Sequence, residues 1–174
     1  KDDEVVLALK VSDMNYFTNQ KYINESQITF HYQKVKLNNS HFLRPESIIF
    51  PKRGGAIGTN KKRITKSYSI LDPNLIGVEP SREVIAEYLF GFFEQFDLRS
   101  LQDNTPIPQL NKHQVESIMF PLPPLPIQQK IAEILSAVDE KIQAEEKKKR
   151  ALENLFKSML SNLMTGKIRV KELG

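Results

Sequence analysis

The chain has 174 residues, 40% of them hydrophobic and ten of them phenylalanine, which suffices for one folded domain with an appendage. It has no cysteine, which excludes disulfides and thiolate zinc sites and fits a reducing cytoplasmic compartment. The sequence has no run of about 18 apolar residues, so no membrane span is predicted.

The net charge of +4 is distributed unevenly along the chain. Residues 47–71 contain six basic residues and no acidic one, whereas the remainder of residues 1–122 is acidic overall. The six are Lys52, Arg53, Lys61, Lys62, Arg63 and Lys66. We call residues 52–66 the basic segment. It favours a local anionic partner, the alternative being a solvated loop that only keeps the protein soluble.

The first fifty residues alternate β-rich runs with polar turns. Strands are predicted at residues 5–9, 28–32, 35–37 and 47–50, with a turn at 38–40. A further strand is predicted at 64–70. The three glycines of the basic segment break regular structure, so this segment should be a loop or two strand ends joined by one.

A helix is predicted to begin at Ser81, a good N-cap, with Glu83 in its first turn. Apolar residues at helical spacing continue to Phe96, and this aromatic stripe is typical of a domain core. Residues 99–110 form a polar loop that contains proline. A short helix capped by Asn111 should follow, over residues 111–118.

Four prolines lie within residues 121–126, in the sequence PLPPLP, and then an apolar pattern of helical period begins. Proline lacks an N–H and fixes φ, so it is excluded from a helix interior but accepted at a helix start. The segment therefore predicts an extended lead-in to a helix over residues 127–164. That helix would be about 57 Å long at about 1.5 Å per residue, and Thr165–Gly166 should end it.

Ten residues of this helix, eight of them apolar, recur at alternating spacings of four and three, as in a coiled-coil seam. They are Ile131, Leu135, Val138, Ile142, Glu145, Lys149, Leu152, Phe156, Met159 and Leu163. A second copy rotated antiparallel about residue 147 places Glu145 opposite Lys149, whereas a parallel pair stacks like charges. We therefore expect an antiparallel coiled coil, the alternative being a splayed, solvated middle at residues 145–149.

Catalytic and metal-binding patterns are not found. The histidines, His31, His41 and His113, are scattered without a Ser or Asp partner by spacing. Neither a zinc-binding H-E-x-x-H sequence nor a P-loop is present. The sequence lacks the glycine motif and the NPPY-like tetrapeptide of amino-methyltransferases. We expect no enzyme, no metal and no cofactor.

Several segments resemble type I restriction–modification specificity subunits. The junction IMFPLPPLPIQQKIAEIL, its continuation AVDEKI and the end LSNLMTGKIRV are similar to the conserved helical region of that family. Upstream, LRPESIIFPKRGGAIG and SREVIAEYLFGFF resemble parts of its target recognition domains. A full subunit has two recognition domains and two long helices, so this chain resembles a half-length subunit or a C-terminal portion.

The resemblance implies an α+β fold: a mixed recognition domain over residues 1–122, a helical dimerisation and spacer region over 123–166, and a tail over 167–174. It implies a non-catalytic reader of one half of a bipartite site in double-stranded DNA. The partners would be methyltransferase subunits and either a second copy or a missing N-terminal half. Whether a restriction subunit joins is left open.

The expected DNA-binding residues lie in the basic segment: Lys52, Arg53, Gly54, Gly55, Thr59, Asn60, Lys61, Lys62, Arg63 and Lys66. Lysines and arginines would meet phosphates, glycines would allow a close approach, and Arg53, Arg63 or Asn60 could read bases. One alternative is a coiled-coil scaffold whose domain binds protein. RNA binding is a further alternative, disfavoured because the aromatic residues lie in an amphipathic helix.

Overall fold

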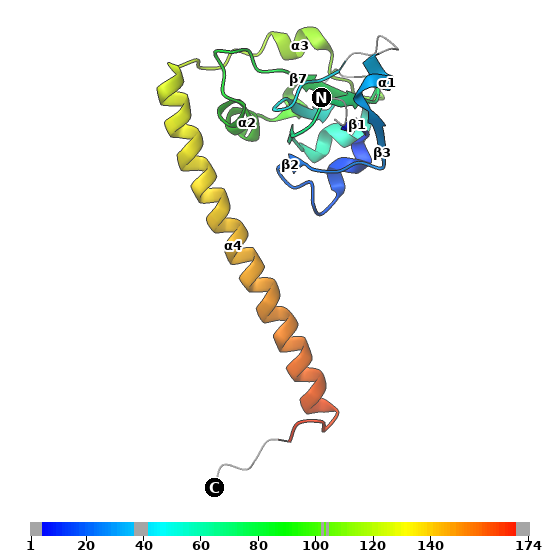
Figure 1. Ribbon diagram of the computed structural model, residues 1–174, viewed down its shortest axis with the longest axis vertical. Coiled ribbons are helices and arrows are strands. Elements are labelled where there is room, and N and C mark those ends of the chain that lie inside the picture. Colours follow the sequence, from blue (N-terminus) through cyan, green and yellow to red (C-terminus); the bar gives the residue numbers. More distant parts are fainter. Residues whose placement is uncertain (1–4, 37–41, 102, 104, 170–174) are drawn as a thin grey trace. The chain divides into compact units, whose positions relative to one another are not determined.

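In the computed structural model, residues 5–36, 42–101, 103 and 105–169 are described. The chain divides into two compact units, Lys1–Ala132 and Glu133–Gly174 (Figure 1). The first unit contains all of the strands that the structure describes, and the second contains most of the long helix α4. The predicted α+β class, a mixed domain followed by one long helix, is confirmed.

The first unit contains two small sheets. The three-stranded sheet has the order β3-β1-β6 and comprises β3 (Ile28–His31), β1 (Val5–Leu9) and β6 (Ser69–Leu71). Strand β1 is antiparallel to β3 and parallel to β6.

The four-stranded sheet has the order β2-β5-β4-β7 and comprises β2 (Tyr22–Ile23), β5 (Arg63–Thr65), β4 (Ile48–Pro51) and β7 (Leu75–Val78). Strand β4 is antiparallel to both of its neighbours. All four of its residues are buried, as expected for a hydrophobic central strand covered on both faces.

Short helices connect the strands and cover the sheets. The 3₁₀ helices are η1 (Val11–Asn15), η2 (Gly54–Thr59) and η3 (Leu98–Leu101). The α-helices are α1 (Tyr32–Lys36), α2 (Ala86–Gln95), α3 (Lys112–Glu116) and α4 (Leu125–Met164). Asn111 is the N-cap of α3, as predicted, and its N–H donates to Gln114 Oε1 at 2.7 Å.

Strand β4 separates two hydrophobic cores. Ile48 and Phe50 face α2, where the Phe50 and Phe93 ring centroids lie 5.4 Å apart. Ile49, which points to the opposite face, packs with Leu9, Met14 and other residues of the second core. The aromatic stripe of residues 84–96 therefore belongs to the core, as its spacing predicts.

Of three predictions from the sequence, two are wrong and one lies outside the described residues. Residues 32–36 form helix α1, so the strand predicted at 35–37 is wrong, and the Tyr32 ring stacks on Phe42 with centroids 5.1 Å apart. The predicted strand at 64–70 is also wrong, because it is divided into β5 and β6 where the chain passes between the two sheets. The predicted turn at 38–40 lies outside the described residues.

Helix α2 begins at Ala86, five residues after the predicted start. Ser81 makes a local turn instead, accepting a hydrogen bond from Val84 N–H through its carbonyl at 3.1 Å. Ile85 is the N-cap residue, and its N–H donates to Gln128 Oε1 at 2.9 Å. A side chain 43 residues further along therefore holds the backbone where α2 begins, which local sequence patterns cannot predict.

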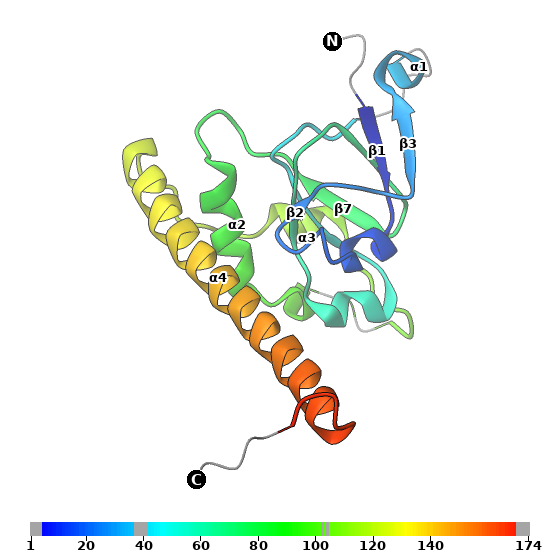
Figure 2. The same cartoon turned by 60° about the horizontal axis from the view of Figure 1, so that its bottom comes forward.

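Gln128 is fully buried at the joint between the domain and α4. Its amide also donates to the carbonyls of Glu83 and Pro123, each at 2.8 Å. Close by, the Tyr88 hydroxyl donates to the Pro121 carbonyl at 2.8 Å. Figure 2 shows the first turns of α4 beside α2. The proline stretch is thus tied by side chains to the start of α2.

The second unit is mainly the long helix. With 40 residues, α4 is about 60 Å long at about 1.5 Å per residue. Gly166 ends it with φ of 69°, and its N–H donates to the Leu163 carbonyl at 3.1 Å, so the predicted stop is confirmed. No described helix is both long and apolar enough to cross a membrane.

Replacing Gln128 with alanine should destabilise the first unit by about 1–3 kcal/mol, because three partly buried backbone groups lose their hydrogen-bond partner. Urea unfolding followed by tyrosine fluorescence measures the change. Gln129→Ala, at the exposed neighbouring position, is the matched control and should change stability by less than about 0.5 kcal/mol. Equal effects of the two substitutions would contradict the role of Gln128.

Candidate functional site

The basic segment begins directly after β4, which ends at Pro51, and it includes β5 (Arg63–Thr65). The sequence predicts a loop or two strand ends joined by a loop, and a strand is confirmed on each side of the connection. The connection, however, is the 3₁₀ helix η2, which contains the glycines. Two groups of hydrogen bonds anchor this segment, one at each end of η2.

The first anchor is the polar loop that follows η3. Gly54 N–H donates to the Pro108 carbonyl at 2.7 Å, and Leu110 N–H donates to the Lys52 carbonyl at 2.8 Å. Arg53 and Gln109 form a β-bridge between these two segments. Gly54 has φ of 64°, a left-handed conformation that glycine adopts without steric cost.

The second anchor joins the segment to the end of α2. Asn60 is left-handed, with φ of 52°, and its Oδ1 accepts a hydrogen bond from Leu98 N–H at 2.9 Å. Lys62 is only 1% exposed, and its Nζ donates to the Phe96 carbonyl at 2.7 Å. Burial lowers the pKa of Lys62, although the charges of Glu94 and Asp97 oppose this shift. A cation suits this position because helix C-termini carry unsatisfied carbonyls.

Arg63 also faces the interior of the domain. It donates to the carbonyls of Asn19, Lys62 and Met14, the last at 3.2 Å. Burial lowers its pKa, and the charge of Glu94 opposes the shift. The structure therefore places Asn60, Lys62 and Arg63 in internal hydrogen bonds, whereas the sequence groups them with the surface residues.

Other members of the basic segment face outward. Arg53, Gly55, Thr59 and Lys66 are exposed, and Lys52 and Lys61 are partly exposed. Lys61 donates to Asn15 Oδ1, and the Lys66 ammonium lies 3.8 Å from the centre of the Tyr22 ring. A Cβ atom built on Gly55 or Gly58 would meet open space, so packing within the chain does not require glycine there. We call Arg53, Gly55, Thr59 and Lys61, which lie on or next to η2, the basic face. Lys66 follows β5, at the other end of the antiparallel pair that β5 forms with β4.

The loop formed by residues 103 and 105–110 contacts the basic segment, a proximity that the sequence does not reveal. Its shape depends on Asp103, whose Oδ1 accepts hydrogen bonds from Gln109 N–H at 2.9 Å and from the Thr105 hydroxyl at 2.8 Å. The Gln109 hydrogen bond is the main reason that the pKa of Asp103 lies below its ordinary value. In the sequence, an aspartate close to prolines indicates a turn here but not the segments that the turn contacts.

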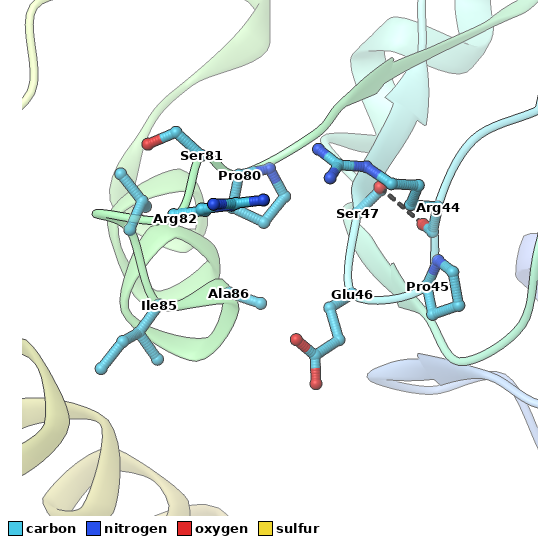
Figure 3. A pocket seen from close by; sticks show the side chains of 10 residues that line it. Arg44, Pro45, Glu46, Ser47, Pro80, Ser81, Arg82, Ile85 and Ala86 are labelled. Carbon is cyan, nitrogen blue, oxygen red and sulfur yellow. Dashed lines mark hydrogen bonds between the residues drawn. The ribbon is translucent and has the colours of Figure 1, made fainter.

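A separate pocket of about 370 Å³ lies between residues 44–47 and 80–86 (Figure 3). Arg44 Nε donates to Glu79 Oε2 at 2.8 Å, and the Ser47 hydroxyl donates to the Arg44 carbonyl at 2.7 Å. In Figure 3 the Glu46 carboxylate and the Arg82 guanidinium also lie at this pocket. Its lining therefore combines both charges and shows no pairing of a nucleophile with a base.

Metal-ligating side chains do not cluster in the described ranges. Among those residues no group of three or more histidines, cysteines or acidic side chains could hold a metal ion. His31 and His113 are exposed on separate elements, and His41 lies outside the described residues.

The predicted seam of α4 is exposed along most of its length. Its apolar members from Leu135 to Leu163 are between 39% and 67% exposed. The two polar members form pairs within the helix, Lys148 to Glu145 and Lys149 to Glu153, each at 4.0 Å. An apolar stripe of this length is typical of a helix that pairs with another helix.

The structure is thus a small α+β domain with exposed cationic residues, joined through a proline stretch to one long helix. Residues 7–154 match the family described as the type I restriction modification DNA specificity domain. The chain belongs to this family.

Two curated relatives come from Methanocaldococcus jannaschii. The putative type I restriction enzyme MjaX specificity subunit is 32% identical over 100 residues, covering 56% of this chain and 24% of the relative. The type I restriction enzyme MjaVIII specificity subunit is 36% identical over 98 residues, covering 53% and 23%. The matches thus span about a quarter of the length of these relatives.

Two solved structures share the fold. A chain from a study of complex assembly and conformational transition of the type I R-M system has a TM-score of 0.64 at 12% identity, over 93% of this chain and 38% of that one. The HsdS subunit from Thermoanaerobacter tengcongensis has a TM-score of 0.59 at 13% identity, over 92% and 37%. At these identities the likeness concerns the fold.

The neighbouring lysines of the basic segment should differ in their effect on stability. Lys62→Ala should lower the free energy of unfolding by about 2–3 kcal/mol, because it removes a buried stem and leaves the Phe96 carbonyl unpaired. Lys61→Ala, at the partly exposed position, should change it by less than about 0.5 kcal/mol. Urea unfolding of both variants measures the difference.

The pH dependence gives a second readout for Lys62. Because its pKa is lowered in the folded state, the unfolded chain binds more protons in the alkaline range below about pH 10. The free energy of unfolding of the wild type minus that of Lys62→Ala should therefore rise with pH across that range. If this difference falls with pH, burial does not disfavour the charged form of Lys62.

Proposed function

We propose that this chain is a DNA reader that recognises one half of a bipartite site within a type I restriction–modification complex. The observation that carries the proposal is the basic face, held on a segment anchored at both ends in a chain of the DNA specificity family. A preorganised cationic surface suits a duplex, because the phosphates supply most of the affinity and only a fixed geometry can read bases.

Within the basic segment, the exposed and buried residues take different roles. Lys61, Lys66 and Lys52 contact phosphates, and Arg53 is the candidate for bidentate contact with guanine. Gly55 lets the duplex approach the backbone closely, and Thr59 adds a short hydroxyl. The residues that hold the segment in shape through internal hydrogen bonds are Gly54, Asn60, Lys62 and Arg63.

The long helix acts as a spacer that pairs with a second helix of the same kind. In the antiparallel arrangement about residue 147, Glu145 of each chain meets Lys149 of the other. In all of the remaining layers, apolar residues meet apolar residues. Two domains would then be held at opposite ends of a rod of about 57–60 Å. Methyltransferase subunits would dock on this assembly and perform the chemistry, while this chain remains non-catalytic.

Selection from random duplexes by the chain assembled with its methyltransferase subunits tests the DNA-reading role. A pair of identical chains should select an inverted repeat with a spacer that is not contacted. Absence of salt-sensitive duplex binding would favour instead the scaffold alternative, in which the domain binds protein.

The triple variant Arg53→Ala, Lys61→Ala and Lys66→Ala should weaken binding to the selected duplex. The slope of log affinity against log salt should flatten by about 0.9 for each phosphate that the variant no longer neutralises. Fluorescence anisotropy across a salt series measures this slope. Lys112→Ala, at an exposed lysine on α3, is the control and should leave the slope unchanged. If the triple variant binds with unchanged affinity and slope, the substituted residues are not part of the DNA interface.

Helix pairing can be tested with charges in the seam. Leu135→Asp combined with Phe156→Asp should abolish self-association in sedimentation equilibrium, because each substitution places an unpaired charge in an apolar layer. Asn154→Asp combined with Ser161→Asp adds the same charges outside the seam and should leave association intact.

The orientation of the pair has its own readout. Glu145→Lys should weaken association, and adding Lys149→Glu should restore it, because the antiparallel pair then regains opposite charges. Mixed with the wild type, this double variant should pair with itself, because an antiparallel mixed pair stacks like charges. A preference for the mixed pair would instead indicate a parallel coiled coil and reject the antiparallel register.

A further inference from the structure

A phenylalanine stands out on the surface beside the basic face. Phe17 lies in the loop between η1 and β2 and is 66% exposed. Figure 2 shows η1, in blue, at the same end of the domain as the turquoise η2. The loop thus shares its end of the domain with the basic segment.

The loop is held rigidly from inside by one side chain. Asn19 is fully buried, and its amide donates to the carbonyls of Asp13 and Glu25, each at 2.8 Å. Its Oδ1 accepts hydrogen bonds from Asn24 N–H at 2.8 Å and from Glu25 N–H at 3.3 Å. All of the hydrogen-bonding capacity of this amide is therefore used to fix the loop that carries Phe17.

Residues of the basic segment form hydrogen bonds with the chain on both sides of Phe17. Two residues before it, Asn15 Oδ1 accepts a hydrogen bond from Lys61. Two residues after it, the Asn19 carbonyl accepts one from Arg63, which also donates to Met14. These hydrogen bonds couple the backbone that carries the Phe17 ring to the basic segment.

We propose that Phe17 is a DNA-contacting residue whose ring touches a base of the recognised half-site. The proposal rests on the DNA-reading function proposed above. The exposed part of an apolar ring gains free energy when a second molecule covers it, and the adjacent Lys61 selects an anionic partner. Thymine methyl groups and unstacked base faces are the parts of a duplex that an aromatic ring can contact.

A base contact has a signature that a phosphate contact lacks. Removing the ring should reduce affinity for the selected duplex while leaving binding to a scrambled duplex and the salt slope unchanged, because the charge of the protein stays the same. It should also relax the sequence preference at one position or one step in each half-site. The triple variant Arg53→Ala, Lys61→Ala and Lys66→Ala should instead weaken binding to both duplexes.

The experiment compares the wild type with Phe17→Ala, each assembled with methyltransferase subunits. Phe17→Ala should bind the selected duplex roughly tenfold more weakly, and repeated selection should return a consensus with one relaxed position. Phe17→Leu, which lacks a ring but keeps apolar bulk, should fall between the two. Phe30→Ala, an exposed phenylalanine on β3, is the matched control and should behave as the wild type.

The outcomes separate this proposal from the one on which it depends. If the wild type selects no duplex, the DNA-reading function fails and this inference fails with it. If the wild type selects a site and Phe17→Ala selects the same site with equal affinity, only the role of Phe17 is overturned. Weakened assembly with the methyltransferase subunits, with DNA affinity unchanged, would overturn it in favour of a protein contact.

Discussion

The buried amide of Gln128 is the interaction on which the joint between domain and helix depends. It lies in the first turn of α4, yet it hydrogen-bonds to the backbone just before α2 and to the proline stretch. A buried amide without its partners is far more costly than an exposed one, so this arrangement tolerates few alternatives. The prolines limit the conformations of the segment that leads into α4, and Gln128 ties that segment to the backbone before α2.

The basic segment is built on a similar constraint, because part of its positive charge serves the fold. Lys62 and Arg63 satisfy backbone carbonyls at the end of α2, in η1 and in the loop after η1, and thereby join segments that are distant in the sequence. Arg53, Lys61 and Lys66 are left at the surface. A rigid base under a cationic surface is what sequence reading on DNA needs, because a mobile loop must first be ordered at a cost in binding free energy.

Much of the fold could be predicted because its signals are local. The period of apolar residues predicts α4 and the aromatic stripe of α2, Gly166 predicts the helix stop, and Asn111 predicts the cap of α3. The failures have a common cause. The start of α2 depends on Gln128, and the division between β5 and β6 depends on which sheet each part joins. Such choices are made by contacts between distant segments, which local propensity does not contain.

The candidate site likewise has features that the local sequence predicts and features that depend on contacts between distant segments. The sequence by itself determined that positive charge is concentrated in residues 52–66 and that the proline joint and seam resemble one family, because charge and spacing are properties of the chain. It could not distinguish Lys61 from Lys62, which are chemically identical neighbours. Only the tertiary structure decided that one faces outward while the other is buried against the Phe96 carbonyl, and that the Phe17 loop lies beside them. Burial is set by the whole fold, because each side chain is covered by elements that the chain reaches only after it has turned back on itself.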